Sequence, residues 1–587
     1  MCGRSSSGPE RRSRTDTDRS QSTVLDPTRR DSVHSSTTPP HTGALNNHCG
    51  DTCSKVESRF AEHGQGARKR IFGAGMSKHH GTEPVSSDLL DAFTEIADRF
   101  PERPAIVHRG HAIAYRRLRE SANAFAAGLG PNPGAVAVQA THTPETVVAL
   151  LGILMAGGVY CPVDPQFPTE RQLAMVAGAG CRTMAGSDHG LTARLGLLPV
   201  PDDRAPGGRG PRTVDPDDPA YLLFTSGSTG QPKPVVTPRR AISATVASLR
   251  ELFELTPEDR VLQFASLNWD TCFEEILPTL TTGAALVLDA EAHSGSFPRF
   301  LRLVERERIT VLDLPTAFWH ELVLHLAEDS LALPDCVRLL VIGGEAASPA
   351  RLADWSALPT GRIRLVNTYG CTETTLITHA VDLSGPRAGA LGLAWDGSTR
   401  APIGRALPHV VERISEDGEL LIGGPALALG YRGLPEATAA RFAPVDGERC
   451  FRTGDRVSRR PDGVLDHRGR LDHEIKVRGI RVDPAEVEAH IAGHPEVGAV
   501  AVAGTTLAGR CALVAYVVPR TPQTVGALDR EVLSYLRGRV PGHLVPSRIT
   551  VVPELVHTAS GKVDRAGSHQ RHAPRGQVTE QVKGDPR

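Results

Sequence analysis

A loop rich in glycine and hydroxyl residues follows an apolar run at residues 220–224, which predicts a buried strand. In order, the loop contains Thr225, Ser226, Gly227, Ser228, Thr229, Gly230, Gln231, Pro232 and Lys233. It offers backbone N–H groups, hydroxyls and an ammonium, which are the groups that bind a polyphosphate. The spacing of the Walker loop is absent, so we predict a phosphate-binding loop of another type, with a flexible surface loop as the alternative.

Further stretches contain residues suited to nucleotide chemistry. They are residues 343–345 (Gly-Gly-Glu), 367–374 (Asn-Thr-Tyr-Gly-Cys-Thr-Glu-Thr), 451–455 (Phe-Arg-Thr-Gly-Asp), 469–472 (Gly-Arg-Leu-Asp) and 560–565 (Ser-Gly-Lys-Val-Asp-Arg). A carboxylate such as Asp455 can accept hydrogen bonds from both hydroxyls of a ribose. A hard cation such as Mg²⁺ is bound by one or two protein carboxylates together with phosphate oxygens. Each motif alone is also compatible with an ordinary turn or an exposed loop.

Taken together and in this order, the motifs resemble the signatures of the adenylate-forming superfamily. That superfamily includes acyl-CoA ligases, luciferases and the adenylation domains of nonribosomal peptide synthetases. The resemblance extends from about Leu89 to Arg565. It implies attack of a carboxylate on the α-phosphate of ATP, with Mg²⁺, release of pyrophosphate and formation of an acyl-adenylate.

The resemblance also implies a role for each matching residue. The phosphate ligands are Thr225, Ser226, Gly227, Ser228, Thr229, Gly230 and Lys233; the nucleoside is held by Gly344, Glu345, Asn367, Tyr369 and Asp455; Glu373 binds Mg²⁺; the catalytic residues are Lys562, Arg470 and Thr372; and Asp472 is the hinge. Two departures from the family pattern stand out, Pro234 after the loop lysine and the pair His467-Arg468 near the ribose motif.

Asp270 separates branches of the superfamily, because amino-acid-activating domains bind the substrate ammonium with an aspartate at this position. The alternative is that Asp270 only caps the helix that follows. By motif alignment the side-chain pocket is lined by Asp270, Thr271, Glu274, Asp313, Val341, Gly343, Thr368, Leu376 and Ile377. Two further carboxylates predict a basic substrate of the lysine, β-lysine or ornithine type. Alternatively, Glu274 or Asp313 pairs with a protein arginine or faces solvent.

The element pattern predicts an α/β fold with two folded domains. Residues 1–80 are expected to form a disordered extension, residues 81–470 a large α/β domain with a β-rich part after about residue 405, residues 471–568 a small mobile α+β domain, and residues 569–587 a disordered tail. Residues 1–75 are interpreted as an upstream extension of the reading frame. Residues 147–163 form an apolar run shorter than the roughly 20 residues that span a bilayer, so a core helix followed by a strand is predicted.

The overall charge and composition exclude several classes of function. The 587 residues include 66 basic and 67 acidic ones, a net charge of −1, and 4% aromatic residues, which gives no electrostatic case for binding nucleic acid or an anionic membrane. Ten scattered cysteines fit a reduced, cytoplasmic protein.

We expect a free-standing adenylation enzyme that delivers its product to the phosphopantetheine arm of a separate peptidyl carrier protein, with a small activating protein as a possible further partner. A ligase acting on coenzyme A and a catalytically silent nucleotide-binding relative remain the alternatives.

Overall fold

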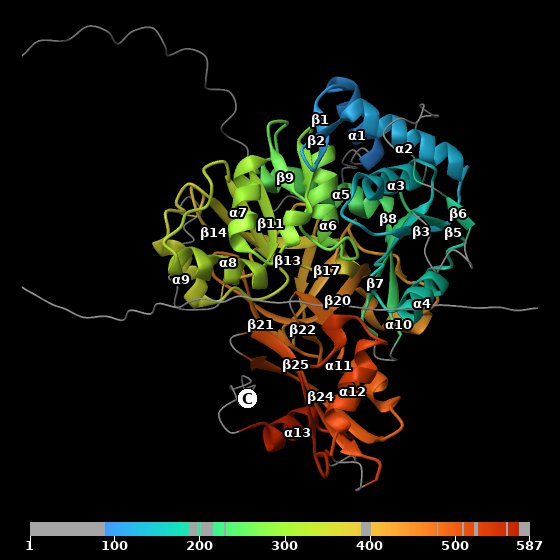
Figure 1. Cartoon of the computed structure of the whole chain (residues 1–587), viewed down its shortest axis with the longest axis vertical. Coiled ribbons are helices and arrows are strands. Elements are labelled where there is room, and N and C mark those ends of the chain that lie inside the picture. Colours follow the sequence, from blue (N-terminus) through green and yellow to red (C-terminus); the bar gives the residue numbers. More distant parts are fainter. Residues whose placement is uncertain are drawn as a thin grey trace, which may run out of the picture. The chain divides into compact units, whose positions relative to one another are not determined.

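The computed structural model describes residues 88–186, 196–198, 200, 215–227, 231–388, 401–477, 479–507, 510–521, 526–558 and 562–574. The predicted N-terminal extension, the end of the C-terminal tail and loop residues 228–230 lie outside these ranges. The described residues form a large N-terminal domain of mixed α/β sheets and a smaller C-terminal domain (Figure 1), in agreement with the predicted fold class.

The first sheet is parallel at its centre and antiparallel at both edges. Its order is β15 (Arg405–Ala406), β14 (Ile377–Ser384), β13 (Arg364–Gly370), β12 (Leu339–Gly343), β11 (Val311–Pro315), β9 (Arg260–Leu262), β10 (Ala285–Leu288), β1 (Pro104–His108) and β2 (His111–Ala114). Ligands of parallel sheets bind beyond the carboxyl ends of the strands. Pocket residue Gly343 ends β12, and Tyr369 lies near the end of β13.

The second sheet carries the predicted phosphate loop. Its order is β18 (Gly430–Tyr431), β8 (Lys233–Pro238), β7 (Pro219–Thr225), β4 (Val159–Val163), β3 (Ala135–Gln139), β5 (Thr183–Ala185) and β6 (Gly196–Leu198). Strands β7, β4, β3, β5 and β6 are parallel, whereas β7 and β8 form an antiparallel pair. The loop therefore joins two hydrogen-bonded strands, which fixes both of its ends.

Helices cover both sheets. They are α1 (Leu89–Arg99), α2 (Tyr115–Leu129), α3 (Pro144–Met155), α4 (Thr169–Ala179), α5 (Arg239–Phe253), α6 (Thr271–Leu280), α7 (Phe297–Arg306), α8 (Thr316–Glu328), α9 (Pro349–Ala357) and α10 (Pro435–Arg441), with 3₁₀ turns η1 (Ala290–His293) and η2 (Thr372–Thr374). The main core contains residues of α3, α5 and α6 together with residues of both sheets. Helices α7, α8 and α9 pack on the other face of the first sheet (Figure 1), and α4 packs on the second. The apolar run at residues 147–163 is α3 followed by β4, which confirms that prediction.

An antiparallel sheet follows, as the predicted β-rich stretch requires. It contains β16 (Val411–Ile414), β17 (Glu419–Gly423), β20 (Glu448–Arg459) and β19 (Phe442–Val445), with β21 (Leu465–Arg470) paired to β20. The register places Asp455 of β20 opposite Arg470 of β21. Two candidate residues that are 15 positions apart in the sequence are thus direct neighbours across this ladder.

The C-terminal domain has its own core, which contains Val487, Val502 and Val532. Its elements are the hairpin β22 (Ile475–Val477) and β23 (Ile480–Val482), the sheet β24 (Val497–Leu507), β25 (Arg510–Pro519) and β26 (Arg548–Val551), helices α11 (Pro484–Ala492), α12 (Leu528–Arg537) and α13 (Arg565–His572), and the turn η4 (Gly542–Leu544). Helix α13 continues to His572, beyond the predicted domain end at residue 568. At the start of this helix, the Asp564 side chain accepts a hydrogen bond from the Gly567 N–H.

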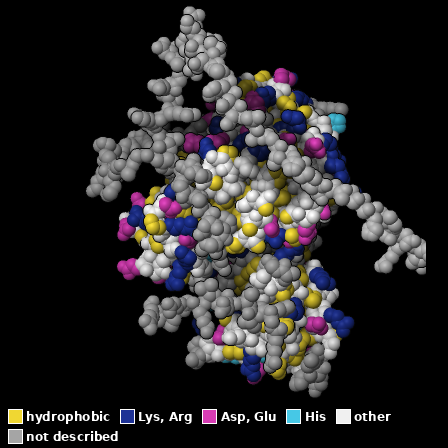
Figure 2. Space-filling view, turned by 90° about the vertical axis from the view of Figure 1, so that its left-hand side faces the viewer, with side chains coloured by type: hydrophobic (Ala, Val, Ile, Leu, Met, Phe, Trp, Pro, Cys, Tyr) yellow, Lys and Arg dark blue, Asp and Glu magenta, His cyan; other side chains and the backbone are white. Residues whose placement is uncertain are grey.

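The described surface agrees with the balanced composition. On the face drawn in Figure 2, basic and acidic side chains of the described residues are interspersed. In the ranges that the structure describes, no helix is both long and apolar enough to span a membrane.

Two neighbouring buried glutamates on α6 allow a matched test of whether hydrogen bonds to a buried carboxyl group stabilise the core. Glu275 is 1% exposed and accepts hydrogen bonds from the Phe264 N–H, the Ala265 N–H and the Gln263 side chain, each at 2.9 Å. We expect Glu275→Gln to lower the free energy of unfolding by about 2 kcal/mol. The glutamine amide has an N–H donor in place of one carboxylate oxygen, and this donor would face a buried donor that then has no acceptor. Urea unfolding of the full chain measures this. Glu274→Gln is the control and should change stability little; equal midpoints for the two variants would contradict the role given to Glu275.

Candidate active site

The predicted phosphate loop leaves β7 at Thr225 and enters β8 at Lys233, and these two residues pair across the strands. The turn is tight at Gly227, where an added Cβ would meet the carbonyl oxygen of Gln231 at 2.1 Å. A glycine is therefore required at this position. The described ends of the loop are fixed, while Ser228, Thr229 and Gly230 lie outside the described residues.

Glu373, the predicted metal ligand, is a buried carboxylate in the turn η2. It is 1% exposed and accepts a hydrogen bond from the Tyr431 hydroxyl at 2.7 Å, and Arg481 lies 3.2 Å from it. Although burial opposes ionisation, the charge of Arg481 and the Tyr431 hydroxyl hold the pKa of Glu373 below its usual range. The site thus contains an ionised acid that is paired with the guanidinium of Arg481.

Tyr431 joins this acid to the phosphate loop. The Lys233 ammonium lies 5.8 Å from the centroid of the Tyr431 ring, whose hydroxyl contacts Glu373. The structure therefore brings together the loop lysine and the acidic residue, which the sequence separates by 140 positions.

Over the described ranges, no group of three or more His, Cys, Asp and Glu side chains could hold a metal by itself. One buried, ionised carboxylate nevertheless fits Mg²⁺, because this ion commonly takes one or two protein carboxylates and completes its shell with water and phosphate oxygens. The guanidinium at Glu373 also shows that this position accepts positive charge.

Asp455, the predicted ribose ligand, lies at the centre of a second polar cluster. It is 4% exposed and accepts from the Tyr369 hydroxyl at 2.6 Å, from Arg470 at 2.8 Å and from His467 Nε2 at 2.9 Å. Despite burial, the His467 hydrogen bond and the Arg470 charge hold the pKa of Asp455 well below its usual range. The departure at His467 thus places a hydrogen-bond partner at Asp455, a contact that the family resemblance did not predict.

The other predicted nucleoside residues lie around Tyr369. Asn367 donates to the carbonyl of Pro402 at 2.7 Å, and its buried Oδ1 has no hydrogen-bond partner among the described residues. Gly344 has a φ of +85°, and an added Cβ there would lie 3.2 Å from the Cα of Gly479. Glu345 accepts from the N–H of Gly479, so the C-terminal domain closes over this part of the site.

Asp270 lies beside the predicted phosphate residues. The Thr372 side chain and the Glu373 carboxylate both lie close enough to Asp270 to act on its pKa, Thr372 lowering it and Glu373 raising it. Burial raises the pKa of Asp270 to about 6, and the charge of Glu373 adds to this rise. Asp270 is the N-cap of α6, with helical backbone angles and no side-chain capping hydrogen bond.

Glu274, one helical turn beyond Asp270 on α6, and Asp313 of β11 form a buried pair. They are 7% and 5% exposed, and the two carboxyl groups lie close enough for each to shift the pKa of the other. Burial raises the pKa of Asp313 to about 7, and burial together with Asp313 and Asp270 raises the pKa of Glu274 well above its usual value. Oδ2 of Asp313 has no hydrogen-bond partner in the described part of the chain, so neither the arginine-paired nor the solvent-facing alternative describes this pair.

The remaining pocket candidates lie on the adjacent strands β11, β12 and β13, after the turn η2, or at the start of α6. Asp313 is opposite Val341 in the parallel pair β11 and β12. Gly343 ends β12, where an added Cβ would meet Oγ1 of Thr368 at 2.5 Å. Leu376 and Ile377 are each 2% exposed and belong to the main core, and Thr271 begins α6 directly after Asp270.

Lys562 does not join these clusters in the described arrangement. It is exposed, and its N–H donates to the Thr558 hydroxyl at 3.2 Å. Asp472, the predicted hinge, is bound by Arg470 at 2.6 Å and by Arg441 at 3.0 Å. Because the predicted hinge lies between the two domains, the catalytic role of Lys562 stays a prediction that requires a different domain arrangement.

Sequence reasoning missed several residues that reach the site from the C-terminal domain. Arg481 contacts Glu373, and Glu486 accepts from the Gly227 N–H at 3.1 Å. The His543 ring lies 5.5 Å from that of Trp269, next to Asp270. The available signal was the position of Arg481 and Glu486 soon after the predicted hinge, but their partners are far away in the sequence.

Comparisons with known proteins agree with this geometry. Residues 93–432 match the family model described as AMP-binding enzyme, and residues 486–562 match that of the AMP-binding enzyme C-terminal domain. The chain is 39% identical over 503 residues to an isonitrile lipopeptide synthase of Streptomyces coeruleorubidus, a match that covers 82% of this chain and 33% of the relative. The chain spans less than half the length of each of the first curated relatives that it matches.

Solved structures give a similar result. An artificially fused adenylation–PCP di-domain of a nonribosomal peptide synthetase from Klebsiella oxytoca has a TM-score of 0.68 at 25% identity, covering 79% of this chain and 93% of that one. A malonyl-CoA ligase with methylmalonyl-CoA and AMP bound has a TM-score of 0.67 at 28% identity, covering 78% of this chain and 97% of that one.

Proposed function

The chain belongs to the family of AMP-binding enzymes, and on this basis we propose that it activates an amino acid as an aminoacyl-adenylate and passes it to a carrier thiol. The observation that carries the proposal is the contact between Asp270 and the turn containing Thr372 and Glu373. A substrate ammonium held by Asp270 would bring the attached carboxylate to the residues assigned to the α-phosphate and the metal.

In the first step, a carboxylate oxygen of the amino acid attacks the α-phosphorus of ATP. The bond from that phosphorus to the bridging oxygen breaks, and pyrophosphate leaves with the electron pair. Residues 225–233 bind the β- and γ-phosphates, and Asp455 accepts from the ribose hydroxyls. Alignment and charge neutralisation supply most of the rate enhancement in such a transfer.

Glu373, with phosphate oxygens, would hold Mg²⁺, which supplies positive charge to the phosphates when it is bound. Lys562 would approach the reacting carboxylate and α-phosphate in another arrangement of the domains. Arg470, beside Asp455, would contact the ribose or a phosphate.

The pair formed by Glu274 and Asp313 supports a basic amino acid as the substrate. Both carboxyls are more than nine-tenths buried, and one oxygen lacks a partner among the described residues, which is costly unless a ligand completes the pair. Asp270 and Glu274 lie four positions apart on one helix, so their side chains are about one turn apart. A diamino acid of the lysine, β-lysine or ornithine type would place one ammonium at Asp270 and the other at this pair.

Delivery to a carrier protein is favoured by the relatives. The Klebsiella structure contains an adenylation domain fused to a PCP, and the curated relative is a lipopeptide synthase. Because the chain is also similar to a malonyl-CoA ligase, coenzyme A is the alternative acceptor. Thioester formation with coenzyme A and with a phosphopantetheinylated carrier protein, measured side by side, distinguishes the two.

The role of Lys562 gives one prediction. We expect Lys562→Ala to lower the rate of adenylate formation by roughly 10²–10³, because one electrostatic donor to the transition state has this effect. ATP–pyrophosphate exchange measures it. Arg571→Ala is the control, since Arg571 is a cation of the same domain whose partner is Glu554 on the surface. An unchanged rate for Lys562→Ala would remove this residue from the mechanism.

The acidic pair gives a prediction about substrate choice. In an exchange panel over amino acids, lysine-type substrates should be activated best. Glu274→Gln and Asp313→Asn should each lower kcat/KM for them by about 30-fold or more, because a cation loses its buried partner. Strongest exchange with a neutral apolar amino acid would refute the basic pocket without affecting adenylation itself.

The same pair predicts a pH dependence. The pKa of Asp313 is raised to about 7, so the pair is largely uncharged at lower pH and gains the charge that binds an ammonium as pH rises. The carboxyls that face it are Glu274, Asp270 and Glu275. KM for the basic substrate should therefore fall about tenfold between roughly pH 6 and 8. Asp313→Asn should flatten this profile, and a flat profile in the unmodified chain would contradict the assignment.

A further inference from the structure

Three side chains already donate hydrogen bonds to Asp455, the carboxylate assigned to the ribose. Oδ1 accepts from Arg470 at 2.8 Å and from His467 Nε2 at 2.9 Å, and Oδ2 accepts from the Tyr369 hydroxyl at 2.6 Å. The pKa of Asp455 lies well below its usual range, so this group is an ionised carboxylate that can only accept. The hydrogen of the contact with His467 therefore lies on Nε2 of the imidazole.

A β-bulge brings two of these donors to one carboxylate. In a regular strand, side chains three positions apart point to opposite faces, as those of His467 and Arg470 would. The pairing of β20 with β21 shifts at this point, so that Arg468 is an extra residue on β21. The extra residue places His467 and Arg470 on the same side of the strand, where both reach Asp455.

The number of acceptor positions on this carboxylate limits what else it can bind. An ionised carboxylate has about four lone-pair sites, divided equally between its oxygens. His467 and Arg470 use both sites of Oδ1, and the Tyr369 hydroxyl uses one site of Oδ2. About one site is therefore left for a ribose, which has two hydroxyl groups.

Of the three donors, His467 is the one that can leave the carboxylate at the least cost. The Arg470 side chain is 13% exposed and is also bound by Asp472 at 2.6 Å, and the Tyr369 ring is buried in a core cluster. The His467 side chain is 32% exposed, and among the described residues Asp455 is its only side-chain hydrogen-bond partner. Water can solvate the imidazole when this contact breaks.

We propose that His467 determines the selectivity for the sugar of the nucleotide, because it takes the acceptor position on Asp455 that a second ribose hydroxyl requires. The inference rests on the proposed function and adds a property to it. Both hydroxyls bind Asp455 only when the hydrogen bond from His467 breaks, so the second hydroxyl replaces an existing bond and adds little affinity. The chain should therefore distinguish only weakly between ATP and an ATP that lacks one ribose hydroxyl.

Calorimetric titration of the full chain with magnesium ATP, magnesium 2′-deoxy-ATP and magnesium 3′-deoxy-ATP tests the inference without an activity assay. The measured quantity is the ratio of Kd for each deoxynucleotide to Kd for ATP, because a change in general nucleotide affinity cancels in this ratio. For the unmodified chain, we expect at least one of the two ratios to lie below about 5. If both ratios lie above this value, the inference is overturned.

Two substitutions at His467 test the role of its donor. His467→Phe frees the acceptor position, and the lower ratio should rise about fivefold or more, because ATP then gains a hydrogen bond to a charged group that the deoxynucleotide lacks. His467→Gln keeps an N–H donor and should stay within about twofold of the unmodified chain. An unchanged ratio in His467→Phe, or an equal rise in both variants, would refute the role of His467.

Arg468→Met is the control on the same strand. The Arg468 side chain donates to the Ser458 hydroxyl at 2.7 Å and is 57% exposed. This substitution should leave both ratios unchanged. A rise as large as that of His467→Phe would mean that the bulge itself, and not the donor, sets the selectivity, and the inference would fail.

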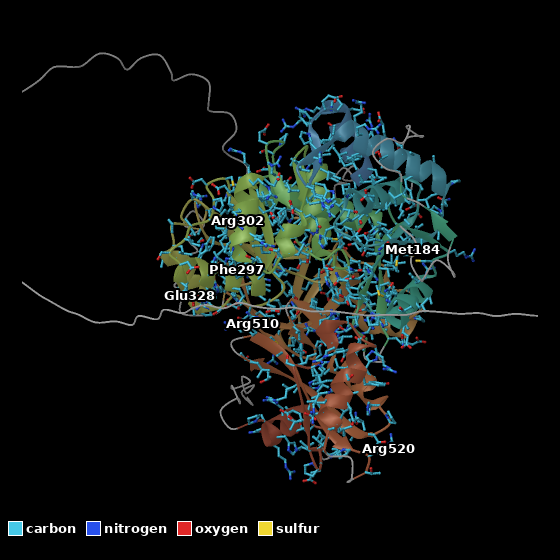
Figure 3. The ribbon with its side chains drawn as sticks, in the orientation of Figure 1. Met184, Phe297, Arg302, Glu328, Arg510 and Arg520 are labelled. Atoms are coloured by element: carbon cyan, nitrogen blue, oxygen red, sulfur yellow. The ribbon has the colours of Figure 1, made fainter. Side chains whose placement is uncertain are left out.

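Arg510→Met is the control for the arrangement of the domains. The charge of Lys476, which lies beyond the predicted hinge, acts on Asp455, so a domain movement alone could change the ratios. Arg510, labelled in Figure 3, forms an ion pair with Glu321 of α8 at 2.5 Å, which joins the two domains away from Asp455. Arg510→Met should leave both ratios unchanged; an effect equal to that of His467→Phe would refute the inference.

The titration with magnesium ATP separates failure of this inference from failure of the proposed function. If the unmodified chain binds ATP and rejects both deoxynucleotides, only the inference is refuted. If no form of the chain binds any of the three nucleotides, the proposed function fails and the inference fails with it.

Discussion

The site depends on buried carboxylates that require a cation. An ionised acid removed from water is stable only when positive charge or hydrogen bonds compensate it. Arg481 meets this requirement for Glu373. Arg470 and His467 meet it for Asp455. Because Arg481 lies beyond the predicted hinge, the ion pair that neutralises Glu373 also holds the C-terminal domain against the large one, whereas Arg470 and His467 contact Asp455 from the neighbouring strand β21.

The two carboxyls of the predicted substrate pocket lack this compensation. Glu274 and Asp313 are buried without a cation among the described residues, and burial raises the pKa of each carboxyl. Burial also raises the pKa of Glu275, the next residue on α6, but its carboxyl oxygens accept hydrogen bonds from three donors. An acid that the fold leaves uncompensated destabilises the empty pocket, and it is for the same reason suited to selecting a ligand that brings a positive charge.

Much of the fold could be predicted because its local signals are strong. The helix predicted at residues 528–537 and the strands around residues 220–224 and 310–314 are present, since continuous apolar runs and amphipathic spacing depend on nearby residues only. The predicted end at residue 568 missed the last turn of α13, whose residues are polar and give no apolar period. The pairing of His467 with Asp455 was also missed, because it depends on the register of β20 and β21.

The sequence by itself determined the family, the order of the motifs and the chemical type of each candidate residue, because glycine, carboxylate and ammonium groups have the same chemistry in any fold. Only the tertiary structure decided which of them meet. It placed Lys233 and Glu373 at one tyrosine, brought Glu274 close to Asp313, left Lys562 exposed, and brought Arg481 to Glu373 and Glu486 to Gly227. The physical reason is that charge pairing acts through distances of a few ångströms in space, which strand order and domain arrangement set independently of spacing along the chain.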